Sequence, residues 1–304
     1  MFIMKKKGSV VQLDRISDFG SEGWGFESSL GHFLLFFFLL FNNLGAQEII
    51  SKIELPRYIN ETSGLEYYKD YLVTHNDSGN EPVIYYLDKE GRFSFKRSFD
   101  YLTNHDWEDL ASDKDFLYIA DMGNNFDTRK NLQIVKVPID PKTNRTEFIN
   151  FYYPEQSEFE FRLSSMYDAE GLISIDDYLL IFTKNRAKKI TEIYKISKSP
   201  DSQIAEKIGS LDCQSIVTGA DYNKDLKLLV LTATVSFEEY YILKLEDFDL
   251  KKSINYQINM YEIPLKKTQV ESIKIIDKNN FWITSEAETF GSPMLYKVKI
   301  NSEH

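Results

Sequence analysis

Three glutamates stand at the same position of a short repeated pattern, two residues before an apolar residue that continues into an apolar strand. They are Glu108, Glu170 and Glu271. Carboxylates that converge repel one another, so they need a cation, a shared proton or water between them. Because oxygens from Asp, Glu and Asn suit a hard cation, we predict a Ca²⁺ site built from these glutamates. The supporting ligands that we expect are Asp121, Asn124 and Asn185.

The alternative use of the same side chains is structural. Carboxylates and amides in tight loops commonly accept hydrogen bonds from backbone N–H groups, which would hold the loops between strands without a metal. The residue types alone leave both uses open.

Two histidines and two basic residues lie in the loops that come before or after the apolar strands of the repeated pattern. His75 and His105 are candidate general bases, although a lone loop histidine is more often structural. Lys184 and Arg186 could hold a phosphate or a carboxylate, because a guanidinium donates two parallel hydrogen bonds to such groups. A solvated basic turn is the alternative for this pair.

Aromatic and amide side chains complete the candidate ligand contacts. Trp107 could stack on a sugar ring, although packing between neighbouring sheets is the more common use of a tryptophan in this position. Asn124 and Asn125 could donate and accept hydrogen bonds beside it. These residues favour a small molecule or a glycan as the ligand.

The elements that carry these residues recur five times along the chain. Each repeat has a polar start, a short apolar strand, a turn, a second apolar strand and a polar end. The shared apolar residue recurs at intervals of 45, 62, 48 and 53 residues. Repeats of about 40–50 residues built from short strands are typical of β-propeller blades. The shared residues are Leu65, Leu110, Leu172, Ala220 and Ile273.

Further strands complete each repeat. A third strand alternates apolar and polar residues, and a fourth, more polar strand follows in the first four repeats. The last repeat lacks a fourth strand, and Glu48–Leu55 has the pattern to supply it, which would close the ring and remove an exposed edge. We predict an all-β propeller with five blades over residues 47–304. Six blades are the alternative, with Tyr153–Met166 as a degenerate blade instead of a long loop.

A ring of this kind would bring distant residues together. In each blade the innermost strand starts, and the second strand ends, on the same face of the propeller. We therefore expect the glutamates of different repeats to meet at one mouth of the central channel.

Composition limits the partners. The chain has 36 Lys and Arg against 47 Asp and Glu, and its net charge of −11 argues against nucleic acid or an anionic membrane surface. Cations and polyhydroxylated ligands fit this charge better.

The single cysteine, Cys213, excludes an internal disulfide and a cysteine-based zinc site. The sequence has no G-x-S-x-G, P-loop, H-E-x-x-H or G-x-G-x-x-G motif, which disfavours the common hydrolase, nucleotide-binding and zinc-protease mechanisms.

The first 46 residues are expected to lie outside the fold. Phe33–Phe41 is too short to span a bilayer but matches the apolar region of a secretory signal, and Leu44–Ala46 supplies a cleavage site. We therefore expect a signal peptide at residues 30–46, an exported protein and no stable membrane span. Gln12–Arg15 and Gly25–Ser28 resemble the conceptual translation of a bacterial tRNA gene. Residues 1–29 are thus expected to be a mis-assigned start or a disordered extension.

Several short motifs carry a family resemblance: Ser63–Glu66, His75–Gly79, Trp107–Leu110, Tyr118–Asn125 and Asp168–Leu172. They resemble exported bacterial propellers of the phytase-like and esterase-like group, with a looser similarity to gluconolactonase-type propellers. The resemblance implies a divalent metal, usually calcium, at the channel mouth on carboxylate and Asn ligands. The matching positions are Glu108, Glu170, Asn185 and Glu271.

Two functions are compatible with these features. The first is an exported, monomeric binding module that holds a small molecule, glycan or protein on its acidic face, with Ca²⁺ as the expected cation. The alternative is a metal-dependent hydrolase of a lactone, ester or phosphoester, in which the metal polarises the substrate and activates water. Propellers host both functions, so the fold does not decide between them.

Overall fold

Strands are the only regular secondary structure in the residues that the computed structural model describes, which are 47–236, 239–250, 257–287 and 291–301. The expected signal peptide and the segment 1–29 lie outside these residues. Within them, no helix is long and apolar enough to cross a membrane. All of the described strands belong to one unit, Gly45–His304.

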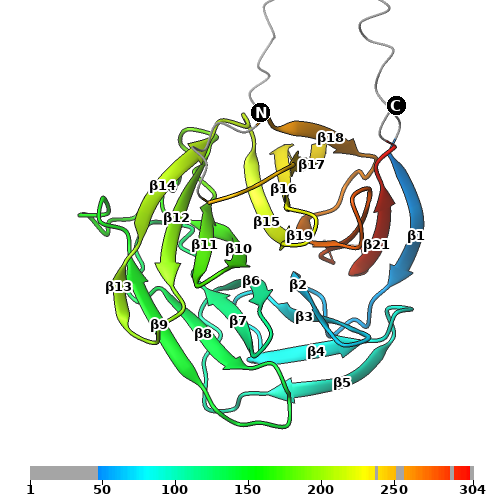
Figure 1. The fold of residues 1–304 in the computed structure, drawn as a ribbon, viewed down its shortest axis with the longest axis horizontal. Coiled ribbons are helices and arrows are strands. Elements are labelled where there is room, and N and C mark those ends of the chain that lie inside the picture. The colour runs from blue at the N-terminus through cyan, green and yellow to red at the C-terminus, as the bar shows by residue number, and fades with distance from the viewer. Residues whose placement is uncertain (1–46, 237–238, 251–256, 288–290, 302–304) are drawn as a thin grey trace, which may run out of the picture. The chain divides into compact units, whose positions relative to one another are not determined.

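The strands form five small sheets arranged as the blades of a β-propeller, which confirms the predicted fold (Figure 1). The first strand of each repeat lies innermost and the later strands pair outward in chain order. Each of these pairs is antiparallel, as expected for strands that are joined by short turns.

The blades are described from the innermost strand outward. Blade 1 contains β2 (Thr62–Tyr68), β3 (Tyr71–Asn76), β4 (Val83–Leu87) and β5 (Phe93–Ser98). Blade 2 contains β6 (Trp107–Ser112), β7 (Phe116–Asp121), β8 (Gln133–Pro138) and β9 (Glu147–Tyr152). Blade 3 contains β10 (Ala169–Ile175), β11 (Tyr178–Thr183), β12 (Thr191–Ser197) and β14 (Glu206–Leu211).

The last two blades complete the ring. Blade 4 contains β15 (Ile216–Asn223), β16 (Leu228–Ser236), β17 (Glu239–Leu245) and β18 (Asn259–Ile263). Blade 5 contains β19 (Val270–Ile275), β20 (Asn280–Ser285), β21 (Met294–Lys299) and, from the start of the fold, β1 (Glu48–Glu54). β1 pairs antiparallel with β21, with Glu54 opposite Met294, so the predicted closure by the N-terminal strand is confirmed.

Apolar side chains fill the five interfaces between neighbouring blades. At the closing interface, Leu295 of blade 5 packs in one cluster with Leu65, Leu72 and Leu87 of blade 1. The five shared residues of the sequence repeat are each only 1–2 % exposed and lie in these clusters. Burying such side chains contributes about 1.5–3 kcal/mol for each large aliphatic residue, so the repeat pattern itself encodes the ring.

Each innermost strand also has a β-bulge near its start. The register shifts between Trp107 and Leu110 in β6, between Ala169 and Gly171 in β10, and at the matching place in β2, β15 and β19. A bulge bends a strand and turns its side chains out of the regular alternation. The five bulges therefore re-aim the residues just before the shared apolar position.

The six-bladed alternative is wrong. Residues 153–166 form no strand and run as a long loop from β9 toward β10. The predicted fourth strand of the third repeat is divided into two parts. Its first part, β13 (Ser202–Ile204), pairs in parallel with β9 of blade 2, and its second part belongs to β14 of blade 3. The division gives hydrogen-bond partners to the open edge of β9.

Candidate functional site

One backbone hydrogen bond recurs in four blades and joins the two polar segments of each repeat. The residue that follows the second strand donates its N–H to the carbonyl of a residue at or just before the start of the innermost strand. The donor and acceptor residues are Asp77 and Glu61, Met122 and Asp106, Lys184 and Asp168, and Glu286 and Gln269, at 2.8, 3.1, 2.7 and 2.9 Å. The polar ends of all these repeats therefore meet on one face of the ring.

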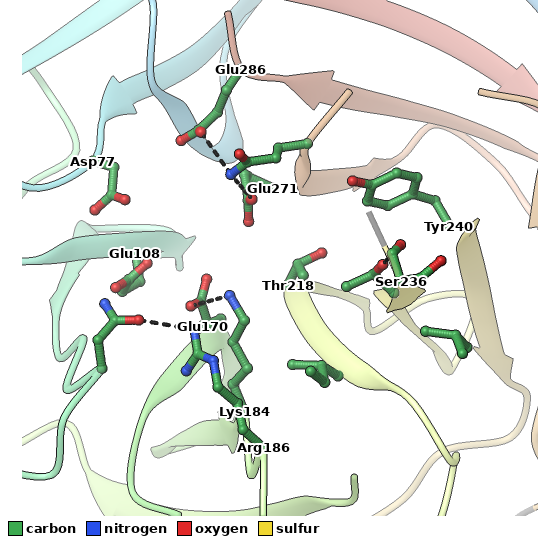
Figure 2. Close-up of a pocket in the computed structure, with 15 residues that line it drawn as sticks. Asp77, Glu108, Glu170, Lys184, Arg186, Thr218, Ser236, Tyr240, Glu271 and Glu286 are labelled. Carbon is green, nitrogen blue, oxygen red and sulfur yellow. Dashed lines mark hydrogen bonds and ion pairs between the residues drawn. The ribbon is translucent and has the colours of Figure 1, made fainter. Parts of the chain in front are cut away.

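A cavity of about 330 Å³ opens on this face, and all five blades contribute to its lining (Figure 2). We call it the mouth cavity. Glu108, Glu170 and Glu271 all line it, so the ring brings together glutamates that are far apart in the sequence. Asn125, Lys184 and Arg186, which were predicted as ligand contacts, line it as well.

Three carboxylates on one side of the mouth cavity form the acid cluster: Asp77, Asp106 and Glu108. One oxygen from each lies within 4.8 Å of the others. Glu108 is only 3 % exposed, and no ion pair with a described cation neutralises any of the three. Gly123 packs directly against the carboxylates of Glu108 and Asp106, where any side chain would collide with them.

Burial and mutual repulsion raise the pKa values in the acid cluster. Desolvation, with the neighbouring Glu170 carboxylate, raises the pKa of Asp77 to about 8. Desolvation and Asp168 raise the pKa of Asp106 to about 6. Burial, followed by repulsion from Asp77, raises the pKa of Glu108 well above its ordinary value. A bound cation would reverse these shifts, because it stabilises the ionised carboxylates.

A second group of carboxylates in the same cavity has its own cations, and we call it the ion-pair side. Lys184 Nζ donates to Glu170 Oε1 at 2.5 Å, and Arg186 pairs with Asp168. Arg186 Nη2 also donates to Asn125 Oδ1 at 2.9 Å. Although burial alone would lower the pKa of Lys184, the surrounding carboxylates raise it above its ordinary value.

Blade 5 supplies two further carboxylates. Gln269 Nε2 donates to Glu286 Oε2 at 3.0 Å and to Glu271 Oε1 at 3.3 Å. Burial raises the pKa of Glu271 to about 7, and burial with repulsion from Glu271 raises the pKa of Glu286 to about 9. A second set of oxygens, from Glu108, Asp168 and Glu170, also lies within 4.8 Å of one another. Glu271 was predicted as a metal ligand, but it belongs neither to this set nor to the acid cluster.

Blade 4 supplies the uncharged wall. Ile216 and Val235 present apolar surface, while Thr218 and Ser236 add hydroxyl groups. The Thr218 hydroxyl is buried and has no hydrogen-bond partner within the described part of the chain. Buried polar atoms are normally satisfied, so this hydroxyl is available to a polar group in the cavity.

Six predicted site residues do not line the mouth cavity, and three of them are the two histidines and Trp107. His75 is fully buried, its Nδ1 lies 2.9 Å from the Asn76 carbonyl oxygen, and burial lowers its pKa to about 4. Trp107 is fully buried at the interface of blades 1 and 2, with its ring 5.7 Å from that of His75. The ligand-stacking use of Trp107 is therefore wrong, because the blade interface takes up the whole indole. His105 is exposed outside the cavity.

The other predicted ligands have structural partners. Asp121 is fully buried and accepts hydrogen bonds from Arg129 Nη2 and Gln133 Nε2, both at 2.9 Å. Asn185 Oδ1 accepts the Lys188 N–H at 3.0 Å. Asn124 Oδ1 accepts the Arg129 N–H at 2.9 Å. For these three residues, the structural alternative describes the observed contacts.

Sequence reasoning did not select several acids of the mouth. Asp106 and Asp168 stand two residues before Glu108 and Glu170, so blades 2 and 3 share an Asp-x-Glu motif that an alignment of the repeats could have revealed. Asp77 and Glu286 occupy in their blades the place of Lys184 in blade 3, as the recurring backbone hydrogen bond indicates.

Comparisons with known proteins add little to this description. No protein-family model and no curated protein matches the chain. The chain is similar to a chain in the crystal structure of the mitotic checkpoint complex, with 10 % identity and a TM-score of 0.44 over 95 % of this chain and 99 % of that chain. The propeller follows from the five sheets themselves, and the resemblance to the phytase-like and esterase-like group stays a prediction.

Proposed function

We propose that this protein is a ligand-binding β-propeller that holds a divalent cation, Ca²⁺ in preference to others, in the acid cluster of its mouth cavity. Asp77, Asp106 and Glu108 would supply the protein oxygens, with Glu170 and Asp168 beside them. The cation would neutralise the cluster and offer open coordination positions to a ligand.

The observation that carries the proposal is a buried carboxylate without a counter-charge. Glu108 lies within 4.8 Å of the oxygens of Asp77 and Asp106, and no described cation pairs with the three. Leaving an unpaired charge buried costs several kcal/mol, which a bound cation would remove. Ca²⁺ accepts irregular sets of oxygen ligands, whereas Mg²⁺ demands near-octahedral geometry.

The size and walls of the cavity support a ligand in addition to the ion. A volume of about 330 Å³ lies at the lower end of small-molecule pockets, which span about 300–1,000 Å³. Its hydroxyl and apolar wall suits a small molecule or a glycan. We also propose, from the apolar segment 33–41, that the protein is exported. An exported protein would need only a weak affinity for Ca²⁺, since extracellular modules bind it with a Kd on the order of 10⁻⁴ to 10⁻³ M.

Calorimetric titration with Ca²⁺ tests the proposal. The parent protein is expected to bind one Ca²⁺ ion, and Glu108→Gln to weaken binding by at least about 100-fold, since even partners outside the ligand sphere change metal affinity by 10–100-fold. Glu262→Gln is the matched control, because it makes the same chemical change at an exposed position on β18. A parent that binds no Ca²⁺, or a Glu108→Gln variant that binds as the parent does, contradicts the proposal.

One observation favours hydrolysis as a second candidate function. Glu271 lines the mouth cavity apart from the acid cluster, and its pKa of about 7 suits a general base that takes a proton from water. Ester, lactone and phosphomonoester substrates, each with and without EDTA, would test it. Turnover that EDTA abolishes would establish the hydrolase, whereas inactivity of the Ca²⁺-loaded protein on all three classes would leave ligand binding alone.

A further inference from the structure

Two stacked aromatic rings are exposed to solvent, and one of them directly follows Asn125, which lines the mouth cavity. The rings of Phe126 and Phe161 are 4.7 Å apart with an angle of 21° between their planes, and the two residues are 45 % and 64 % exposed. Leu163, two residues after Phe161 in the loop between β9 and β10, is 79 % exposed. We call Phe126, Phe161 and Leu163 the aromatic ledge. Scattered exposed apolar residues are common, but a group of them indicates a binding surface.

The backbone that carries the ledge is firmly held. Asp127, fully buried, accepts hydrogen bonds from Ser165 Oγ at 2.6 Å and from the Tyr167 N–H at 3.0 Å. The Arg162 N–H donates to the Phe126 carbonyl at 3.1 Å, which ties the two ledge segments directly to each other. A surface that is ordered before the ligand arrives loses less entropy on binding.

The segments that carry the ledge are linked to the mouth cavity through Arg186. The side chain of Asn125, the residue before Phe126, lines the cavity and accepts a hydrogen bond from Arg186. The Arg186 N–H donates to the Ser165 carbonyl at 2.9 Å, at the other end of the ledge loop. Both segments of the ledge are therefore fixed to one residue of the cavity wall.

We propose that the aromatic ledge is the second half of the ligand site and that the ligand is a neutral oligosaccharide. One sugar unit would occupy the mouth cavity and the next would lie on the ledge. The placement in the cavity rests on the proposed function, because the hydroxyls of that sugar would coordinate the cation. A sugar ring presents C–H groups on its face and hydroxyls at its rim, so it suits an apolar platform beside Thr218, Ser236 and a bound Ca²⁺. The excess of carboxylates disfavours an acidic sugar.

A protein partner fits the ledge less well. Each aromatic side chain buries at most about 150–250 Å², so two rings and one leucine fall short of the roughly 800 Å² per partner of a stable interface. The cavity beside them is concave, polar and small. A chain of a few sugar units matches both the flat ledge and the enclosed cavity.

Titration with oligosaccharides of increasing length tests the inference. Maltose to maltohexaose and cellobiose to cellohexaose, with the mannan and xylan series, would be titrated into the Ca²⁺-saturated full chain by calorimetry. Affinity for one series is expected to rise with length. Phe161→Ala should remove about five- to tenfold of the affinity for the disaccharide and for every longer member, as expected for one lost aromatic contact, and leave the affinity for the corresponding monosaccharide unchanged.

Controls separate the ledge from general damage and from the cation. Phe93→Ala removes a ring of similar exposure, 40 %, at the outer edge of blade 1 and should leave all affinities unchanged. Ca²⁺ affinity should be the same in Phe161→Ala as in the parent. If Ca²⁺ binds but no saccharide series does, or if Phe161→Ala binds the hexasaccharide as the parent does, the inference is overturned while the proposed function stands. If no Ca²⁺ binds but Phe161→Ala still weakens length-dependent binding, the proposed function fails and the ledge stands.

Discussion

Two groups of buried charges lie along the innermost strands, and they differ in how their carboxylates are neutralised. In the inner triad, Lys274 Nζ pairs with Glu66 Oε1 at 2.5 Å and with Asp221 Oδ1 at 2.7 Å. Backbone N–H groups of Tyr67 and Ile275 donate to the same carboxylates, each at 2.7 Å. The acid cluster at the mouth has no such cation.

The contrast indicates which acids hold the ring together and which are free to bind. The inner triad links blades 1, 4 and 5, and one buried ammonium lies between its two carboxylates, so each of these carboxylates has a cationic partner inside the protein. The carboxylates of the acid cluster lie within 4.8 Å of one another, and no cation of the described residues forms an ion pair with them. Buried carboxylates are informative about function only when the protein does not neutralise them itself.

The largest expected effect comes from breaking the matched group. Lys274→Met should lower the free energy of unfolding by about 3–5 kcal/mol, because it leaves two buried carboxylates without their cation. Urea denaturation measures this loss. Lys224→Met is the control, since it removes an exposed pair with Asp176 and should cost less than about 1 kcal/mol. Equal stability of the two variants would show that the inner triad is not structural.

The unmatched group predicts an unusual pH dependence. The pKa of Asp77, about 8 in the folded protein against an ordinary 3.8, means that the folded state binds more protons than the unfolded state between these values. The stability of the Ca²⁺-free protein should therefore fall as the pH rises, by about 2 kcal/mol between pH 6.5 and pH 8 for this one carboxyl. His75 acts oppositely, because its lowered pKa of about 4 makes stability rise from pH 4 to 6.5. The fall should thus be clearest above pH 6.5.

Thermal unfolding with and without Ca²⁺ measures this difference. The ion needs ionised carboxylates, so at pH 8 it would relieve repulsion that is absent at pH 5, and it should raise the melting temperature more at pH 8. An equal Ca²⁺ effect at both pH values would remove the distinction between the two groups.

A smaller effect is expected from converting a matched acid into an unmatched one. Lys184→Met frees Glu170 beside the acid cluster and removes a positive charge from the mouth cavity. Ca²⁺ affinity should increase about three- to tenfold, which corresponds to roughly 1 kcal/mol. Calorimetry under the conditions used for the parent would reveal it, and unchanged affinity would place the ion away from Glu170.

The repeat pattern was sufficient to predict the propeller, because the same physical requirement acts five times. Leu65 and its four counterparts must each be buried between blades, and β1 must cover the edge of β21. The repeats also predicted that Glu108, Glu170 and Glu271 share one face. Each repeat can be interpreted from its own residues, without information on the neighbouring blades.

Tertiary structure decided which of those residues remain available. Asp121 and Arg129 belong to one blade, but Lys274 neutralises acids of two other blades, and no spacing in the sequence reveals that match. Trp107 was predicted as a ligand contact and His75 as a general base, but both side chains are fully buried, with their rings 5.7 Å apart. The sequence determined the ring and its acidic mouth by itself, because each repeat carries the same apolar residue that must be buried between blades and the same polar segment next to it. Only the folded ring decided where charge stays unmatched, because that depends on distances between blades.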